Sequence, residues 1–245
     1  MKKFLVLQLR PEREASDSEF RAILAKSGLA ADETHRITLE RDALPEHFDL
    51  QDFAGVIVGG GPGCVSDPID TKSPLEARME TDVFSLMPQI TAQDIPFMGC
   101  CYGIGILAHH LGAAVSKEQY GEPIGTSRCF VTDAGRRDPI LNGVPDAFDA
   151  FVGHKEAAQS LPAGAVHLVR SGPCPFQMIR YGQNVYATQF HPEADGAEIQ
   201  FRIKVYSDRG YFDPCDAARL SEMAGASHVY APPRILQNFT SRYRT

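Results

Sequence analysis

Residues 97–112 read F-M-G-C-C-Y-G-I-G-I-L-A-H-H-L-G, and this segment constrains the fold more than any other. An apolar run leads into Gly99, Cys101 follows, and a helical pattern begins at Gly103. A residue placed between glycines where a strand becomes a helix projects from the carboxyl edge of a sheet. Helix N-terminal amides favour the thiolate, which is the reactive form of cysteine. The segment therefore predicts a nucleophile elbow at Cys101, whereas Cys100 is expected to be a core residue.

A second segment supplies a candidate partner for this thiol. Residues 188–193 read T-Q-F-H-P-E, so that a strand-like run ends in His191 and a carboxylate follows at Glu193. Catalytic partners commonly meet in space from distant parts of a chain, which allows His191 to reach Cys101. We predict that His191 is the proton carrier and that Glu193 orients its ring. A His-Pro-Glu tripeptide alone is more often a surface turn, so the prediction depends on its combination with the elbow.

The first half of the chain predicts an α/β fold, in which a mostly parallel sheet carries helices on both faces. Helical spacing at Phe20, Ile23 and Leu24 predicts a helix that stops at Gly28. Ligands gather at the carboxyl ends of strands in such sheets, so the glycine loop after the third strand and the elbow after the fourth should adjoin the site. The predicted strands cover residues 4–9, 37–39, 56–58 and 95–98.

The second half is richer in extended runs from Gly125 onward. Strands are expected at 126–132, 147–154 and 166–170, and a hairpin at 176–190 that turns at residues 181–184. Ala197, Phe201 and Val205 then suggest a helix, and Pro232-Pro233 precedes a last one. With 245 residues, of which 43% are hydrophobic, the chain is expected to form a single domain over residues 1–245.

Charge and leader patterns exclude several classes of function. The net charge of −7 and the absence of long Lys/Arg blocks argue against a nucleic acid partner. The apolar run after Lys3 is too short for a signal peptide or a membrane helix, which predicts a cytoplasmic protein that does not act at a membrane.

The cysteines and histidines argue against structural disulfides and against a zinc site. The six cysteines show no Cys-x-x-Cys spacing, so reduced thiols are expected rather than structural disulfides. Cys100, Cys101, His109 and His110 lack the spacing of a zinc site, and a helix would direct the two histidines to different faces. We predict neither a metal site nor a cofactor.

Three ordered blocks resemble the triad-type, or class I, glutamine amidotransferases, and within them the glutaminase part of GMP synthetase and its stand-alone relatives. These blocks are the glycine-rich strand and loop at 55–63, the elbow at Cys101 with residues 106–112 behind it, and the Q-F-H-P-E run at 189–193. Weaker likeness extends over residues 152–156, 161–165, 171–182 and 235–239. The resemblance thus covers most of the chain and implies a flavodoxin-like sheet with an added β-rich segment.

The resemblance also implies a reaction. Cys101 would attack the side-chain amide carbon of glutamine and form a γ-glutamyl thioester. His191 would protonate departing ammonia and later deprotonate water, while Glu193 supports the ring. The backbone amides of Gly61 and Tyr102 would stabilise the oxyanion. Ammonia would pass to a partner synthetase.

Substrate contacts are expected at Gly60, Gly63, Gly105, His154 and Lys155. Gly105 departs from the family pattern, which carries a substrate-seating glutamine at this position. One hypothesis is that the missing side chain widens the pocket, so that a larger γ-glutamyl peptide or amide is accepted. The alternative is that a neighbouring residue supplies the contact, because sites are often rebuilt by loop variation.

Two other classes of function stay open at this point. Gly103-x-Gly105-x-x-Ala108 fits a loose dinucleotide fingerprint, with Glu118 and Glu122 as ribose candidates, and would indicate an NAD(P)-binding protein. A catalytically silent binding subunit could also keep the scaffold. The G-G-G-P-G run at 59–63 lacks the Gly-Lys-Ser/Thr that a phosphate loop requires and is read as a tight turn.

Overall fold

In the computed structural model, which describes residues 1–45, 49–209 and 212–244, nine strands form one sheet in the order β2-β1-β3-β4-β11-β10-β9-β6-β7. The strands β2, β1, β3, β4 and β11 are parallel, and the remaining pairs are antiparallel. The sheet strands are β1 (Phe4–Gln8), β2 (Thr34–Thr38), β3 (Gly55–Val58), β4 (Phe97–Cys100), β6 (Glu122–Val131), β7 (Ala147–His154), β9 (Val166–Ser171), β10 (Met178–Tyr181) and β11 (Val185–Thr188). The short strands β5 (Val115–Ser116) and β8 (Ala157–Ala158) pair with each other.

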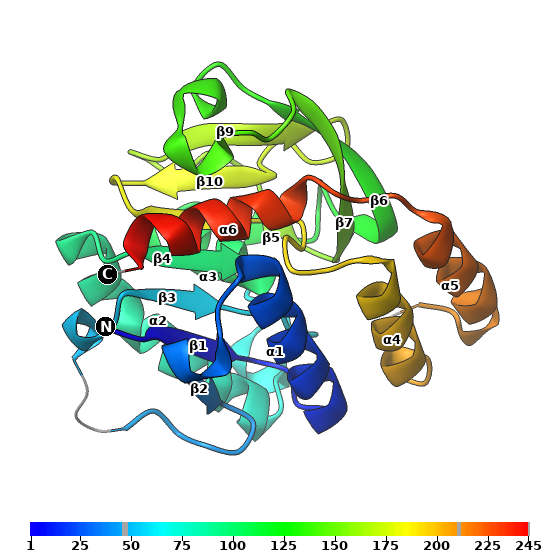
Figure 1. The fold of residues 1–245 in the computed structure, drawn as a ribbon. Coiled ribbons are helices and arrows are strands. Elements are labelled where there is room, and N and C mark those ends of the chain that lie inside the picture. The colour runs from blue at the N-terminus through cyan, green and yellow to red at the C-terminus, as the bar shows by residue number, and fades with distance from the viewer. Residues whose placement is uncertain (46–48, 210–211, 245) are drawn as a thin grey trace.

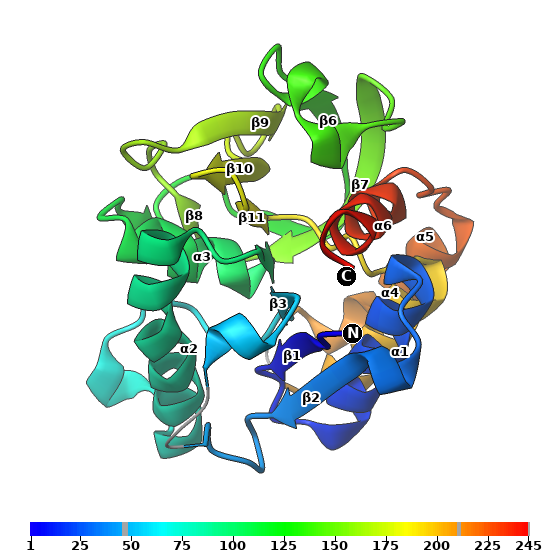
Figure 2. The ribbon, with the colours of Figure 1, turned by 60° about the vertical axis from the view of Figure 1, so that its left-hand side comes forward.

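Helices cover both faces of the parallel half of the sheet (Figures 1 and 2). The helices are α1 (Arg13–Ser27), α2 (Pro74–Gln93), α3 (Tyr102–His110), α4 (Gly196–Tyr206), α5 (Ala217–Ala226) and α6 (Pro232–Tyr243). Alternate residues of β1 point to opposite faces, as strand geometry requires. Phe4 packs with the α1 and α6 side chains, and Leu5 with those of α2 and α3. The predicted α/β fold is therefore confirmed.

Most predicted elements are present, with small shifts at their ends. Gly28 ends α1 with a left-handed backbone at φ 74°, which glycine adopts readily. The second strand lies earlier than expected, so that Leu39 falls beyond its end. The predicted helix near Ala197 exists as α4, but its apolar stripe of Ala197, Phe201 and Val205 is not the buried face. The buried side chains of α4 are Glu198, Ile199, Arg202, Ile203 and Tyr206.

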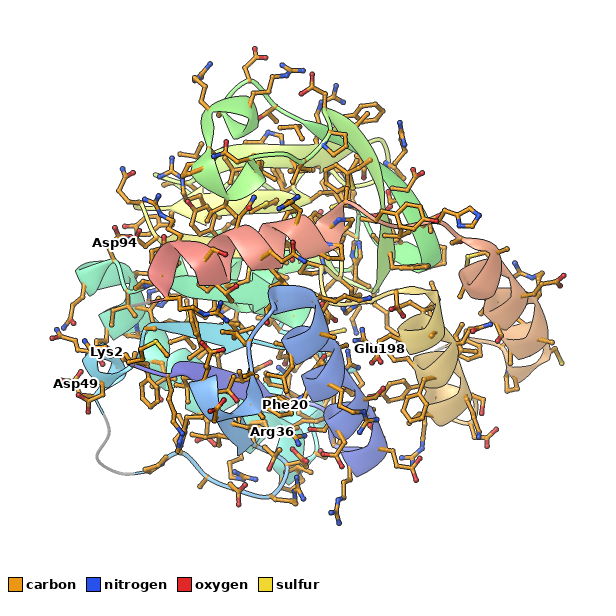
Figure 3. All side chains as sticks on the ribbon, viewed as in Figure 1. Lys2, Phe20, Arg36, Asp49, Asp94 and Glu198 are labelled. Carbon is orange, nitrogen blue, oxygen red and sulfur yellow. The ribbon has the colours of Figure 1, made fainter. Side chains whose placement is uncertain are left out.

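Two polar contacts fix the edges of the parallel half. Asp94 follows α2 with φ 52°, and its carboxylate accepts hydrogen bonds from the backbone amides of Gln183 and Asn184 at 3.0 Å each. The hairpin turn before β11 is thereby tied to the start of β4. At the other edge, the guanidinium of Arg36 on β2 lies 4.6 Å from the centre of the Phe20 ring on α1. Asp94, Arg36 and Phe20 are labelled in Figure 3.

Within the described residues, none of the helices is long and apolar enough to cross a lipid bilayer. All six cysteines are unpaired, and Cys100 is buried in the core as expected.

Candidate active site

Cys101 lies at a strained turn between β4 and α3. Its backbone has φ 54° and ψ −87°, which is uncommon for a residue with a side chain. A Cβ atom on Gly99 would lie 2.9 Å from the Gly103 carbonyl carbon and 2.9 Å from Phe97 Cε1, so glycine is required there. Gly103 has more room, since its nearest contact would be Val58 at 3.8 Å. The geometry is that of a nucleophile elbow.

The sheet register brings the His191 segment to this turn. The strands β4 and β11 are parallel neighbours, and Cys100 pairs with Thr188 at their carboxyl ends. The Cys101 amide donates to the Thr188 carbonyl at 2.8 Å, so the chain after β11 leaves the sheet beside the thiol. The His191 amide in turn donates to the Phe151 carbonyl of β7 at 2.9 Å.

Cys101, His191 and Glu193 form one interacting group. Cys101 and His191 line the same pocket, the Cys101 sulfur acts on the His191 ring, and His191 Nδ1 lies 2.8 Å from Glu193 Oε1. Because a carboxylate oxygen accepts, Nδ1 carries the proton in the pair with Glu193, which leaves Nε2 as the ring nitrogen available to the thiol. All three residues are buried. The structure thus brings together the three side chains that the sequence singled out.

The electrostatics of this group favour a charged imidazole. Burial of the ring lowers the pKa of His191, but the Glu193 carboxylate and the Cys101 sulfur raise it, and the pKa reaches about 9. Burial has the opposite effect on the Glu193 carboxyl and raises its pKa. The charges of His191 and Arg202 outweigh burial and hold the pKa of Glu193 well below its usual value. At neutral pH the group therefore contains an imidazolium beside a carboxylate.

Arg202 on α4 is a member of this group that the sequence analysis did not identify. Its Nη2 donates to Glu193 Oε1 at 2.9 Å, and its Nε donates to Glu198 Oε1 at 3.2 Å. Its Nη1 also lies 3.1 Å from His191 Nδ1, but both atoms are donors when Nδ1 is protonated. Glu198, labelled in Figure 3, lies between α4 and α1. The Ser18 hydroxyl of α1 donates to it at 2.7 Å. Arg202 thus anchors the Glu193 side of the group to two helices.

A buried ion pair between Arg10 and Glu19 lies behind the glycine loop at residues 59–63. Arg10, just after β1, donates from Nε to Glu19 Oε1 at 2.8 Å, and the Gly60 amide donates to the same oxygen at 3.0 Å. A Cβ atom on Gly60 would lie 3.0 Å from His191 Cε1. Gly60 is therefore packed against the imidazole, and a substrate contact at Gly60 stays a prediction.

Cys101 lies at the junction of two pockets, which share Gly61, Cys101 and Gly153. The first, named here the Glu156 pocket, is lined among others by Gly63, Tyr102, Gly105, His154, Lys155 and Glu156. The second, the Arg202 pocket, is lined among others by Arg10, Ile124, Val152, Ile199, Arg202 and Ile203, with His191. Apart from Gly60, every predicted oxyanion or substrate residue thus lines the Glu156 pocket.

The backbone around the predicted oxyanion donors is tightly fixed. A Cβ atom on Gly61 would lie 2.9 Å from the Leu9 carbonyl oxygen, so only glycine allows this approach. Tyr102 is the first residue of α3, and its hydroxyl donates to Glu80, which Lys72 also binds at 2.6 Å. The Tyr102 hydroxyl is therefore fixed at Glu80, while its amide lies at the helix N-terminus.

The space beside Gly105 is filled, which corrects the expectation of a wider pocket. A Cβ atom on Gly105 would lie 3.2 Å from Glu156 Oε1 and 3.3 Å from Val65 Cγ2. The Glu156 carboxylate accepts hydrogen bonds from the Val65 amide at 2.7 Å and the Ser66 amide at 2.8 Å. A buried anion therefore lies next to the position that carries glutamine in the family pattern.

One group of three potential metal ligands occurs among the described residues. Glu122, His154 and Cys174 are buried, and their ligand atoms lie within 4.8 Å of one another. His154 Nε2 already lies 3.1 Å from Glu122 Oε2, and Gln177 donates to the same oxygen at 2.5 Å. His154 Nδ1 donates to the Glu156 carbonyl at 2.8 Å. Glu122 and His154 thus form a hydrogen-bonded support behind the Glu156 pocket. The buried Glu122 carboxylate is already bound by His154 and Gln177, so it is not placed to hold a ribose.

The fold is that of the glutamine amidotransferases. The crystal structure of a glutamine amidotransferase from Thermotoga maritima superposes with a TM-score of 0.76, covering 99% of this chain and 98% of that chain at 22% identity. The sequence model for glutamine amidotransferase class-I matches residues 17–202. The chain therefore belongs to the class I glutamine amidotransferase family, whose members are glutamine-hydrolysing enzymes.

The chain is also similar to curated proteins that share one name. GMP synthase [glutamine-hydrolyzing] from Thermosipho melanesiensis is 30% identical over 165 residues, which are 67% of this chain and 28% of that protein. The protein of the same name from Thermosipho africanus is 31% identical over 153 residues, or 62% of this chain and 26% of that protein. The chain thus spans less than a third of the length of these relatives.

Proposed function

We propose that this chain hydrolyses the γ-amide of glutamine through a thioester on Cys101. The observation that carries the proposal is that Cys101, His191 and Glu193 lie together at the ends of β4 and β11, with Cys101 and His191 in one pocket and His191 hydrogen-bonded to Glu193. A thiol, a proton carrier and an orienting carboxylate are the parts that amide hydrolysis by cysteine requires. The family membership supports glutamine as the substrate.

The proposed reaction begins with Cys101 as a thiolate beside the His191 imidazolium, a pairing favoured by the raised pKa of His191. Sulfur attacks the amide carbon, and the amides of Gly61 and Tyr102 donate to the oxyanion. His191 gives its proton to the departing nitrogen and then accepts one from water. Water cleaves the thioester and releases glutamate. Glu193 stabilises the imidazolium throughout.

The charges of the Glu156 pocket suit the amino-acid end of glutamine. Lys155 offers a cation and Glu156 a buried anion, which match the α-carboxylate and the α-ammonium group. Gly63 and Gly105 have no side chains, so their backbone would contact the acyl chain of the substrate directly. His154 fixes this wall of the pocket by its hydrogen bond to the Glu156 carbonyl. We assign these residues to substrate binding.

Ammonia is proposed to pass to a synthetase partner. The relatives named GMP synthase [glutamine-hydrolyzing] support this part of the proposal, because they extend well beyond the region that this chain matches. The nucleophile must stay a thiol, so the proposal includes a reducing compartment, the cytoplasm.

The direct test is glutamate release from glutamine by the purified chain. Cys101→Ser should lower kcat by ~1,000-fold or more, as removal of a nucleophile does in other triads. Cys215→Ser is the matched control, because Cys215 is exposed and distant in sequence from the elbow. Turnover that survives Cys101→Ser would refute the proposal.

A further inference from the structure

The Arg202 pocket lies on the side of Cys101 that faces the proton carrier. His191 lines this pocket and is not among the described residues that line the Glu156 pocket. We propose that the Arg202 pocket is a leaving-group subsite for a neutral alkyl amine, so that N-alkyl γ-glutamyl amides are substrates. This inference rests on the proposed function, since it needs the thioester on Cys101.

The direction of departure follows from the position of the proton. When the tetrahedral intermediate collapses, the nitrogen must receive its proton from His191. The acyl chain occupies the Glu156 pocket, where the amide of Tyr102 and the charges of Lys155 and Glu156 lie. The nitrogen substituent is then left on the His191 side of the sulfur, which is the Arg202 pocket.

The walls of the Arg202 pocket are suited to an alkyl group rather than to ammonia. Ile124 of β6, Val152 of β7, and Ile199 and Ile203 of α4 contribute aliphatic side chains. Ammonia has no apolar surface to bury against them. Each methylene of an alkyl amine gains about fourfold in binding when it leaves water, which would appear in kcat/KM.

Apart from the Cys101 thiolate, which becomes neutral when it bonds to the acyl carbon, the charged side chains around the pocket balance, which favours a neutral substituent. Arg10 pairs with Glu19 at 2.8 Å, and Arg202 pairs with Glu193 at 2.9 Å and Glu198 at 3.2 Å. The imidazolium of His191 offsets the remaining carboxylate. A carboxylate or a second ammonium on the leaving amine would therefore lack a free counterion among these residues, whereas an alkyl chain needs none.

The step balances without a further reactant. The sulfur–carbon bond forms as the Cys101 thiolate attacks, and the carbon–nitrogen bond breaks as His191 transfers its proton to nitrogen. A neutral alkyl amine leaves, and water then converts the thioester to glutamate and the thiol.

The test compares kcat/KM for three substrates by glutamate release: L-glutamine, γ-glutamyl-n-propylamide and γ-glutamylglycine. We expect the propylamide to exceed glutamine at least about tenfold and γ-glutamylglycine to be the poorest. Glutamate from glutamine but not from the propylamide would overturn the inference alone. No glutamate from any substrate would overturn the proposed function and the inference with it. A higher kcat/KM for γ-glutamylglycine than for the propylamide would overturn the claim that the Arg202 pocket prefers an uncharged leaving group.

Variants of Ile124, a half-buried wall residue, test the pocket itself. Ile124→Phe fills the pocket and should lower the propylamide-to-glutamine ratio at least about tenfold, and Ile124→Ala about fourfold. The matched control is Lys204→Ala, an exposed change on α4 that should leave the ratio unchanged. An unchanged ratio in both Ile124 variants would overturn the inference, because the pocket would then serve only as an exit for ammonia.

Discussion

The carboxylate of Glu156 lies beside the point where a side chain on Gly105 would begin, 3.2 Å from a Cβ atom there. Restoring the family residue with Gly105→Gln should therefore damage the site. We expect kcat/KM for glutamine to fall about tenfold or more, because overpacking a buried site costs about 1–3 kcal/mol. Steady-state kinetics give the measurement. The double variant Gly105→Gln/Val65→Ala removes the other close contact, Val65 Cγ2 at 3.3 Å, and should recover part of the loss. A gain from Gly105→Gln alone would contradict this account.

Glu156→Gln tests the assignment of the substrate ammonium group. The variant keeps the size of the side chain but removes its charge, so KM for glutamine should rise ~10-fold or more with a smaller change in kcat. The matched control is Glu118→Gln, an exposed carboxylate outside the Glu156 pocket. Equal losses in both variants would reject the assignment.

The raised pKa of His191 sets an alkaline limit for activity. Because the pKa of His191 is about 9, kcat/KM should stay high at neutral pH and fall as the pH rises through about 9. Glu193→Gln removes the carboxylate that raises this pKa, so it should lower kcat about 100-fold or more and move the alkaline limb to lower pH. An unshifted limb would mean that Glu193 does not act on the ring.

The same group makes stability depend on pH. A pKa raised in the folded state stabilises the protein below the ordinary value of 6.5, and this contribution is lost as the pH rises through about 9. The lowered pKa of Glu193 also stabilises the folded state, but this contribution is present at neutral pH and is lost as the pH falls toward the pKa of the folded state. Denaturant unfolding of the wild-type chain across pH 6–10, with its thiols kept reduced, should therefore show falling stability on the alkaline side.

Arg202 is a positioning residue whose removal should shift the pH profile in the opposite direction to Glu193→Gln. Arg202→Gln takes a cation away from the imidazolium, so the pKa of His191 and the alkaline limb should move up. Breaking a buried ion pair should also cost about 3–5 kcal/mol of stability. Arg219→Gln, which breaks an exposed pair with Asp216, is the control and should cost less than about 1 kcal/mol. A purely structural role for Arg202 would leave the pH profile unmoved.

Gly99 and Gly103 flank Cys101 but should respond differently to alanine. Gly99→Ala places a Cβ atom 2.9 Å from backbone and should destabilise the fold by about 1–3 kcal/mol. Gly103→Ala has 3.8 Å of room within α3, so it should be neutral or stabilising by up to about 1 kcal/mol. Denaturant unfolding of both variants checks the difference. Equal costs would show that the elbow does not depend on Gly99.

Local patterns in the sequence predict much of this fold. Buried parallel strands such as Phe4–Gln8 read as continuous apolar runs, and Gly28 marks the end of α1. The helix α2 is not among the predicted elements, although its sequence carries helix signals. Ser73 and Glu76 form a capping box around Pro74, and the buried side chains of Met79, Val83, Met87 and Ile90 recur at helical spacing.

The polar parts of the site were harder to predict, because they break the rule that buried faces are apolar. On α4, Glu198 and Arg202 are buried, which turns the helix away from the face that its apolar stripe suggests. Their partners lie on distant segments, so spacing alone does not reveal them. Arg10 could have been found from its position at the carboxyl end of β1, where ligands of such sheets gather.

The central claim is that Cys101 is the nucleophile toward a γ-glutamyl group. Treatment with a diazo ketone analogue of glutamine, followed by peptide mass spectrometry, tests it most directly, with the other five cysteines as internal controls. The account predicts one adduct, on the peptide that contains Cys101, together with loss of glutamate release, and no adduct in Cys101→Ser. Labelling of another residue, with glutamate release intact in Cys101→Ser, would contradict it.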